Sequence, residues 1–186
     1  MFLIYSLIYM IVTAVLLPFE YLKRPKEVRQ RWLREKFGFF NSELPVPNCE
    51  TRTLYEPLAP YGSCPTGHRP SHRPNSELIW VHAVSMGEVI SAVPFIKELA
   101  SGHPSAGIIL STITDTGQKV AKERLSGIAA VVYLPLDISL IFKKVLKSIR
   151  PDLFITVETE LWPNIFRVLE REGIPVVVVN GRISEG

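Results

Sequence analysis

The sequence has few cysteines and lacks the short motifs by which several large enzyme classes are identified. It contains two cysteines in 186 residues, which is too few for a disulfide framework and compatible with a reducing cytosol. It contains no Walker sequence, no G-x-G-x-x-G, no H-E-x-x-H and no G-x-S-x-G. These absences argue against a nucleotide clasp, a zincin and a serine hydrolase built within this chain.

Charged residues are also absent from the N-terminal segment, Met1 to Phe19. A helix of roughly nineteen residues reaches about 29 Å, close to the thickness of a bilayer's hydrocarbon core. We therefore expect residues 1–22 to form a transmembrane anchor. Basic residues follow this run instead of preceding it, which argues against a cleaved signal peptide. The positive-inside rule then predicts that the rest of the chain is cytoplasmic.

The segment 23–40 is strongly basic, although the net charge of the whole chain is only +3. Its pattern predicts a basic interfacial helix, because cations are attracted to anionic lipid headgroups. Trp32 and Phe37 are expected to act as interfacial anchors. A solvated helix that merely follows the anchor remains an alternative. The basic residues are Lys23, Arg24, Lys26, Arg29, Arg31, Arg34 and Lys36.

The segment 41–77 is rich in proline and has no sustained periodicity, so we interpret it as a loop or linker. It contains Cys49, Cys64, His68 and His72. A zinc site is a weaker interpretation, because the spacing of the two cysteines matches no standard zinc motif.

From residue 78 to 186 apolar strands alternate with amphipathic helices. The strands are expected at 78–84, 106–111, 129–134, 153–157 and 176–179. This alternation predicts an α/β fold with a parallel, doubly wound sheet. Asp115 and Asp137 are expected to cap the helices that follow the second and third strands.

In a parallel sheet the carboxyl ends of the strands share one edge, which is where α/β folds bind ligands. At the first such end, Ser85-Met86-Gly87-Glu88 matches the S-x-x-E capping box, and Gly87 allows close approach of a ligand. Glu88 is therefore either a helix cap or a functional carboxylate. Glu158 directly follows the fourth strand and is either a functional carboxylate or a cap or solvated loop residue. Trp162 is expected to pack beneath its loop.

We expect polar residues from four loops to lie at this edge of the sheet, although most of them could equally be helix caps or solvated loop residues. They are His82, Ser85, Gly87 and Glu88; Ser111, Thr112, Thr114 and Asp115; Glu158 and Glu160; and Asn180 and Arg182.

Three segments, HAVSMGE (82–88), ETELWPN (158–164) and NGRIS (180–184), closely resemble the N-terminal domain of the 3-deoxy-D-manno-octulosonic acid (Kdo) transferases. These are membrane-associated glycosyltransferases of lipopolysaccharide inner-core biosynthesis. The resemblance covers nearly the whole chain apart from the Pro-rich stretch. Met86 and Gly181 differ from the family pattern, and neither difference alters a charged group.

The resemblance implies a B-type glycosyltransferase with two Rossmann-like halves, located at the bacterial inner membrane. This half would bind a lipid A precursor, and a C-terminal half, absent here, would bind the CMP-Kdo donor. The resemblance implies that Glu88 is the proton acceptor and that Glu158 stabilises the transition state. The residues that we expect to bind the acceptor are Ser85, Gly87, Glu160, Asn180 and Arg182.

No cofactor and no nucleic-acid partner are expected. No metal is expected either, because CMP is a good leaving group and the sequence has no paired-aspartate site for a divalent ion. Since the donor half is missing, we expect the isolated chain to be inactive. Two alternatives remain: a non-catalytic membrane-tethered binding module, and a B-type glycosyltransferase for another lipid-linked acceptor.

Overall fold

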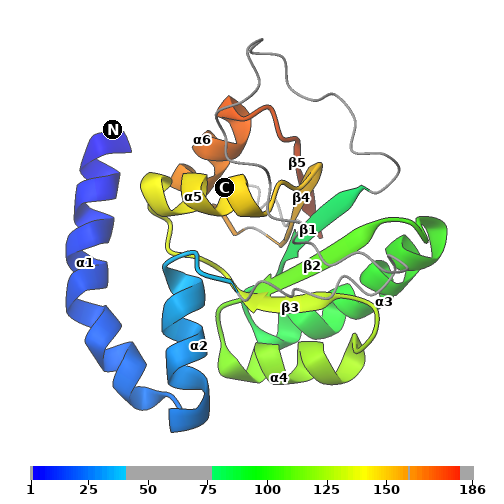
Figure 1. Ribbon diagram of the computed structural model, residues 1–186, viewed down its shortest axis with the longest axis horizontal. Helices are drawn as coiled ribbons and strands as arrows, with labels where there is room; N and C mark the ends of the chain where they lie inside the picture. The colour runs from blue at the N-terminus through cyan, green and yellow to red at the C-terminus, as the bar shows by residue number, and fades with distance from the viewer. Residues whose placement is uncertain (1, 41–76, 159, 181–186) are drawn as a thin grey trace, which may run out of the picture.

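A parallel five-stranded sheet forms the centre of the structure (Figure 1). The computed structural model describes residues 2–40, 77–158 and 160–180. The strands are β1 (Leu78–His82), β2 (Gly107–Thr112), β3 (Ala130–Tyr133), β4 (Leu153–Val157) and β5 (Val176–Val179). Neighbouring strands are parallel in the order β3-β2-β1-β4-β5. This is the strand order of a Rossmann-like half, so the predicted fold class is confirmed.

Six helices accompany the sheet in the described part of the chain. They are α1 (Phe2–Lys23), α2 (Lys26–Lys36), α3 (Met86–Gly102), α4 (Asp115–Arg124), α5 (Ser139–Ser148) and α6 (Pro163–Arg171). α3 and α4 cover one face of the sheet, and α5 and α6 cover the other (Figure 1).

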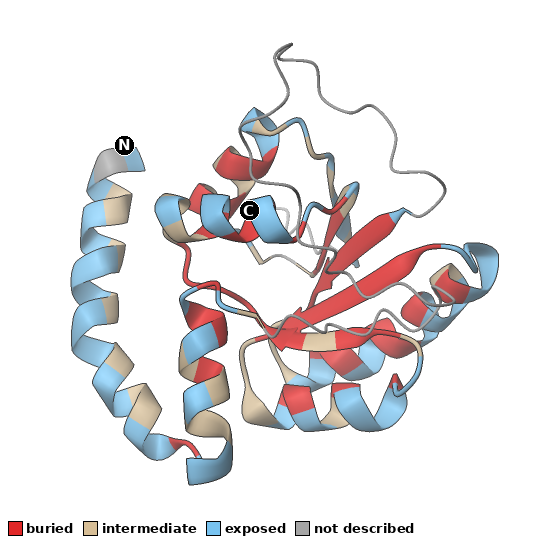
Figure 2. Cartoon of the chain, in the orientation of Figure 1, coloured by how far each residue is buried: buried red, intermediate tan, exposed pale blue. Residues whose placement is uncertain are grey.

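Side chains that alternate along the strands form one apolar core on each face. In β1, Ile79 and Val81 belong to the core beneath α3 and α4, whereas Leu78 and Trp80 belong to the core beneath α5 and α6. Every residue of β1 is buried (Figure 2). A central parallel strand is covered on both faces, which is why its sequence is a continuous apolar run.

α4 has a different N-cap from the one that its sequence pattern predicted. The Oγ1 atom of Thr114 accepts the Gly117 N–H at 3.0 Å, so Thr114 is the cap. Asp115 lies one residue inside the helix and pairs with Arg24 instead. The prediction of Asp115 as the cap is wrong by one residue.

Asp137 joins three segments that are far apart in the sequence. Its Oδ1 accepts the Ile165 N–H at 2.7 Å, and its Oδ2 accepts the Asn164 N–H at 3.4 Å. The Tyr5 hydroxyl donates to Oδ2 at 2.7 Å, and the Tyr9 hydroxyl accepts the Asp137 N–H at 3.1 Å. The carboxylate therefore caps α6, and the prediction that it caps α5 is wrong. Burial raises the pKa of Asp137, although these hydrogen bonds oppose the shift.

α2 covers the outer edge of β3. The Tyr133 N–H donates to Glu35 at 2.6 Å, and Arg31 donates to the Val131 carbonyl at 2.6 Å. Arg31 also pairs with Glu35 at 2.6 Å. Burial raises the pKa of Glu35, and the charge of Arg31 opposes that shift. Because α2 uses the free backbone groups of an edge strand, it protects this side of the sheet from pairing with another chain.

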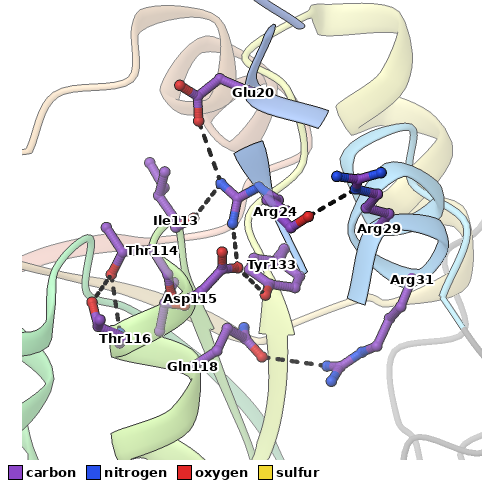
Figure 3. A network of polar contacts seen from close by, with 12 residues as sticks. Glu20, Arg24, Arg29, Arg31, Ile113, Thr114, Asp115, Thr116, Gln118 and Tyr133 are labelled. Carbon is purple, nitrogen blue, oxygen red and sulfur yellow. Dashed lines mark hydrogen bonds and ion pairs between the residues drawn. The ribbon is translucent and has the colours of Figure 1, made fainter. Parts of the chain in front are cut away.

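The junction between α1 and α2 is fixed by Arg24 (Figure 3). Its guanidinium pairs with Asp115 and lies 4.5 Å from the ring centroid of Trp32. The Tyr133 hydroxyl donates to the same carboxylate at 2.5 Å. Trp32 is only 2% exposed, so the prediction that it anchors the chain in a membrane interface is wrong. Phe37, by contrast, is 37% exposed.

α1 is a candidate membrane span by length and composition, over Ile4–Lys23. It contacts α2 and α6 (Figure 1). The membrane contact predicted for residues 23–40 stays a prediction, and the predicted linker, with its four possible zinc ligands, lies almost wholly outside the described residues.

Replacing Asp137 by alanine should lower the free energy of unfolding by about 3 kcal/mol, because two buried N–H groups of α6 lose their acceptor. Glu123→Ala, at an exposed position of α4, is the control and should change it by less than about 0.5 kcal/mol. Urea denaturation in detergent measures both values. Equal stability of the two variants would show that Asp137 is not the cap that α6 needs.

Candidate active site

The loops that follow β1 and β4 lie side by side, because these two strands are paired. His82 lies beside Thr156 in the register of the sheet. The strand order reverses between β1 and β4, and ligands of open α/β sheets bind at this switch point. The two strongest sequence candidates, Glu88 and Glu158, belong to these two loops.

Glu88 belongs to a complete capping box at the start of α3. Its carboxylate accepts the N–H groups of Val84 at 2.8 Å and Ser85 at 3.2 Å, while the Ser85 hydroxyl accepts the Glu88 N–H at 3.4 Å. Glu88 is 8% exposed. The prediction of a cap is confirmed. A carboxylate has about four lone-pair sites, so two accepted hydrogen bonds leave capacity to take a proton.

Gly87 leaves open space where Gly117 does not. A Cβ built on Gly87 would meet only the Ser85 Oγ, at 3.9 Å. A Cβ on Gly117 would lie 2.9 Å from the Thr114 Oγ1 and 3.4 Å from the carbonyl carbon of Ser85. Packing between α4 and the loop before α3 thus explains Gly117. No contact of the described residues explains Gly87, which is consistent with close approach of a ligand there.

The two glycines should respond in opposite ways to substitution. Gly87→Ala should leave the free energy of unfolding unchanged or raise it by up to about 1 kcal/mol, because alanine is the better helix former. Gly117→Ala should lower it by about 2 kcal/mol through overpacking. Thermal unfolding of the two variants provides the comparison. A loss of stability in Gly87→Ala would mean that the fold itself requires this glycine.

Glu158 and Asn180 both adopt left-handed backbone conformations at the ends of neighbouring strands, with φ of 62° and 56°. The Glu158 N–H donates to the Val179 carbonyl at 2.8 Å, which holds this turn against β5. A left-handed glutamate costs about 1 kcal/mol or more, and such strained residues cluster at functional sites. Asparagine tolerates this conformation better.

Glu160 connects the two loops electrostatically. Burial raises its pKa, and the negative charges of Glu88 and Glu158 raise it further. Three of the predicted site carboxylates, from the loops after β1 and β4, therefore interact through their charges. The negative charges around Glu160 make its ionisation less favourable than that of an isolated glutamate.

Removing one charge of the cluster should be visible at Glu160. Glu158→Gln should lower the pKa of Glu160, because its ionised form would face one negative charge fewer. Glu170→Gln, at an exposed position of α6, should leave that pKa unchanged. Carboxyl ¹³C NMR titration reports both. An unshifted Glu160 in the Glu158 variant would show that the two side chains do not interact.

His82 was expected at the edge but is fully buried. Its Nδ1 lies 3.0 Å from the Ser111 Oγ, which also accepts the Trp80 indole N–H at 2.8 Å. Burial lowers the pKa of His82 to about 3, so the imidazole stays neutral near pH 7 and is a structural group. The Trp162 ring packs edge-on against it at 6.0 Å, as predicted for a packing residue.

The polar residues at the end of β2 and in the loop after it are used by the fold. Ser111 and Thr112 are fully buried, Thr114 caps α4, and Asp115 pairs with Arg24. Arg182 lies outside the described residues. In the ranges 2–40, 77–158 and 160–180 no group of three histidine, cysteine or acidic side chains could hold a metal ion.

Comparison with known proteins identifies the family. The family model described as "3-Deoxy-D-manno-octulosonic-acid transferase (kdotransferase)" matches residues 31–186. The chain belongs to the Kdo transferase family. A Kdo transferase of Haemophilus influenzae is 37% identical over 111 residues, which cover 60% of this chain and 26% of that protein.

Two further members are similar over a comparable region. A Kdo transferase of Chlamydia pneumoniae and a probable mitochondrial one of Arabidopsis thaliana are each 34% identical over 118 residues, covering 63% of this chain and 26% of theirs. The chain therefore matches about a quarter of the length of these Kdo transferases.

Proposed function

We propose that this chain is the acceptor-binding half of an enzyme that transfers Kdo from CMP-Kdo to a lipid A precursor. The observation that carries the proposal is the convergence of Glu88, Glu158 and Glu160 at the switch point of the sheet. Family membership supports Kdo transfer in lipopolysaccharide biosynthesis. The donor would bind to a C-terminal domain of the complete enzyme.

In this reaction an acceptor hydroxyl attacks the anomeric carbon of Kdo. A new bond forms between the acceptor oxygen and that carbon, the bond from the carbon to the CMP phosphate breaks, and CMP leaves with the electron pair. Glu88 takes the hydroxyl proton. Attack on the face opposite CMP inverts the anomeric centre, and the negative charge of Glu158 stabilises the oxocarbenium-like transition state.

The backbone geometry suits these roles. Two backbone N–H groups hold the Glu88 carboxylate in one orientation, so little reorganisation is needed when it receives a proton. Ser85, Gly87, Glu160, Asn180 and Arg182 are proposed to bind the acceptor sugar. Glu160, whose pKa is raised by burial and by the charges of Glu88 and Glu158, would hydrogen-bond to a sugar hydroxyl.

The membrane supplies the acceptor. We propose that α1 and the basic residues after it hold the domain at the cytoplasmic face of the inner membrane, where lipid-linked acceptors are made available. The apolar length of α1 supports attachment. Confinement of enzyme and acceptor to one surface raises their effective concentration.

Glu88→Gln in the complete enzyme should lower kcat for Kdo transfer by about 10²-fold or more, because glutamine cannot act as the base. Glutamine also occurs at this position of capping boxes, so α3 should keep its cap. The assay measures transfer from CMP-Kdo to a lipid A precursor, with UDP-sugars in parallel to detect another donor.

Glu98→Gln, at an exposed position of the same helix, is the matched control and should keep the rate of the unmodified enzyme. Thermal unfolding of both variants checks that the fold is intact. Near-normal turnover of Glu88→Gln with an unchanged melting temperature would leave Glu88 as a helix cap only.

A further inference from the structure

α1 has a stripe of mostly polar residues, here called the polar stripe, that faces the rest of the protein. Its half-buried residues recur every three or four positions and therefore lie on one side of the helix. They are Tyr5, Ser6, Tyr9, Thr13, Leu17, Glu20 and Tyr21. A helix that merely begins at the domain and leaves it would be covered at one end only, so this pattern shows that α1 lies alongside the domain.

Specific hydrogen bonds fix both ends of α1. Near its start, the Tyr5 hydroxyl donates to Asp137 at 2.7 Å and the Ser6 hydroxyl donates to the Asn164 Oδ1 at 2.9 Å. Just after its end, Arg24 pairs with Asp115 (Figure 3). These two points are about 28 Å apart along a helix, so the domain holds the full length of α1.

The three acceptors share one location in the fold. Asp115 follows β2, Asp137 follows β3, and Asn164 follows β4. All of them lie in segments that leave the carboxyl edge of the sheet. α1 therefore runs along the same edge that carries Glu88 and Glu158.

The opposite side of α1 is an exposed apolar stripe. Its members are Ile4, Leu7, Ile8, Ile11, Val15, Phe19 and Leu22, each more than half exposed. An exposed apolar surface of this length is typical of a membrane contact. Exposed Lys23 and Lys26 lie at the C-terminal end of this stripe, and exposed Arg34 follows further along α2; their charge is complementary to anionic headgroups.

We propose that α1 lies in the plane of an anionic membrane surface, with its polar stripe bound to the carboxyl edge of the sheet and its apolar stripe immersed in lipid. A spanning α1 would carry Tyr5 and Ser6 away to the far leaflet. It would also remove the Tyr5 hydroxyl from the buried carboxylate of Asp137, which would keep only its two hydrogen bonds from α6, and losing a hydrogen bond to a buried charged group costs free energy. In the in-plane arrangement the polar groups keep their hydrogen bonds while the apolar stripe is buried in lipid. This arrangement does not depend on whether the enzyme transfers Kdo.

Depth measurements with spin labels separate the two arrangements. Cys49 and Cys64 are first replaced by serine. A single cysteine that carries the spin label is then placed at Ile4, Ile11 or Leu22, which share one side of α1. The full chain is reconstituted in vesicles of phosphatidylethanolamine and phosphatidylglycerol, and accessibility to oxygen and to a water-soluble nickel chelate gives each label's depth. We expect one common depth, about 5 to 10 Å below the headgroups.

A spanning helix would give a different depth profile: the label at Ile11 would lie about 15 Å from either membrane surface, and the labels at Ile4 and Leu22 would be shallow. That profile would overturn the proposal. Labels that stay in water would overturn it as well. Binding to vesicles of phosphatidylcholine alone should be weaker than to the anionic vesicles, and equal binding would contradict the role of the exposed cations.

The polar contacts are tested by Tyr5→Phe combined with Tyr9→Phe. This variant removes both hydroxyls that meet Asp137, so the label at Ile4 should change depth while the label at Leu22 keeps it. Tyr21→Phe is the matched control, because the Tyr21 ring contacts Arg29 at the other end of α1. An unchanged depth at Ile4 in the double variant would show that these contacts do not hold the helix.

Discussion

The backbone N–H groups that open at the carboxyl edge of the sheet need acceptors, and the side chains that supply them determine much of this structure. Ser85 and Glu88 serve α3, Thr114 serves α4, and Asp137 serves α6. Each acceptor also fixes a loop against its neighbours: Asp137 draws α1 to α6, and the cap of α4 packs Gly117 against the loop before α3. The loops at the carboxyl edge of the sheet, where the candidate site lies, are thus held in place by the side chains that cap the helices.

The two interpretations of Glu88 do not compete in this geometry. The N–H groups of Val84 and Ser85 hold the carboxylate at the start of α3, where its charge acts on Glu160 of the loop after β4. A residue that must reach back to the cap is confined to few rotamers, and a base confined in this way is already oriented before substrate binds. The proposed catalytic role therefore uses a conformation that the fold requires in any case.

The sequence was sufficient for the parts that depend on local periodicity. The apolar runs predicted all five strands, and S-x-x-E predicted the cap of α3. The sequence did not predict contacts between a residue and a partner from a distant segment of the chain. Asp137 was predicted to cap the helix that directly follows it, but it caps α6. Trp32 was predicted to anchor the chain in a membrane interface, but Arg24 covers its ring. His82 was predicted to lie at the edge of the sheet, but it is enclosed by Ser111 and Trp162. Spacing carries no information about such contacts.

The acidic cluster and the apolar stripe of α1 are best understood together. Both belong to the carboxyl edge, one through the loops after β1 and β4, the other through Asp137, Asn164 and Asp115. Carboxylates repel anionic headgroups, so a site built from them needs an independent attraction to stay near lipid. In the proposed membrane arrangement, the apolar stripe and the exposed cations Lys23, Lys26 and Arg34 supply that attraction. Under the proposed function, the base Glu88 then meets a lipid-linked hydroxyl without a cationic patch inside the site itself.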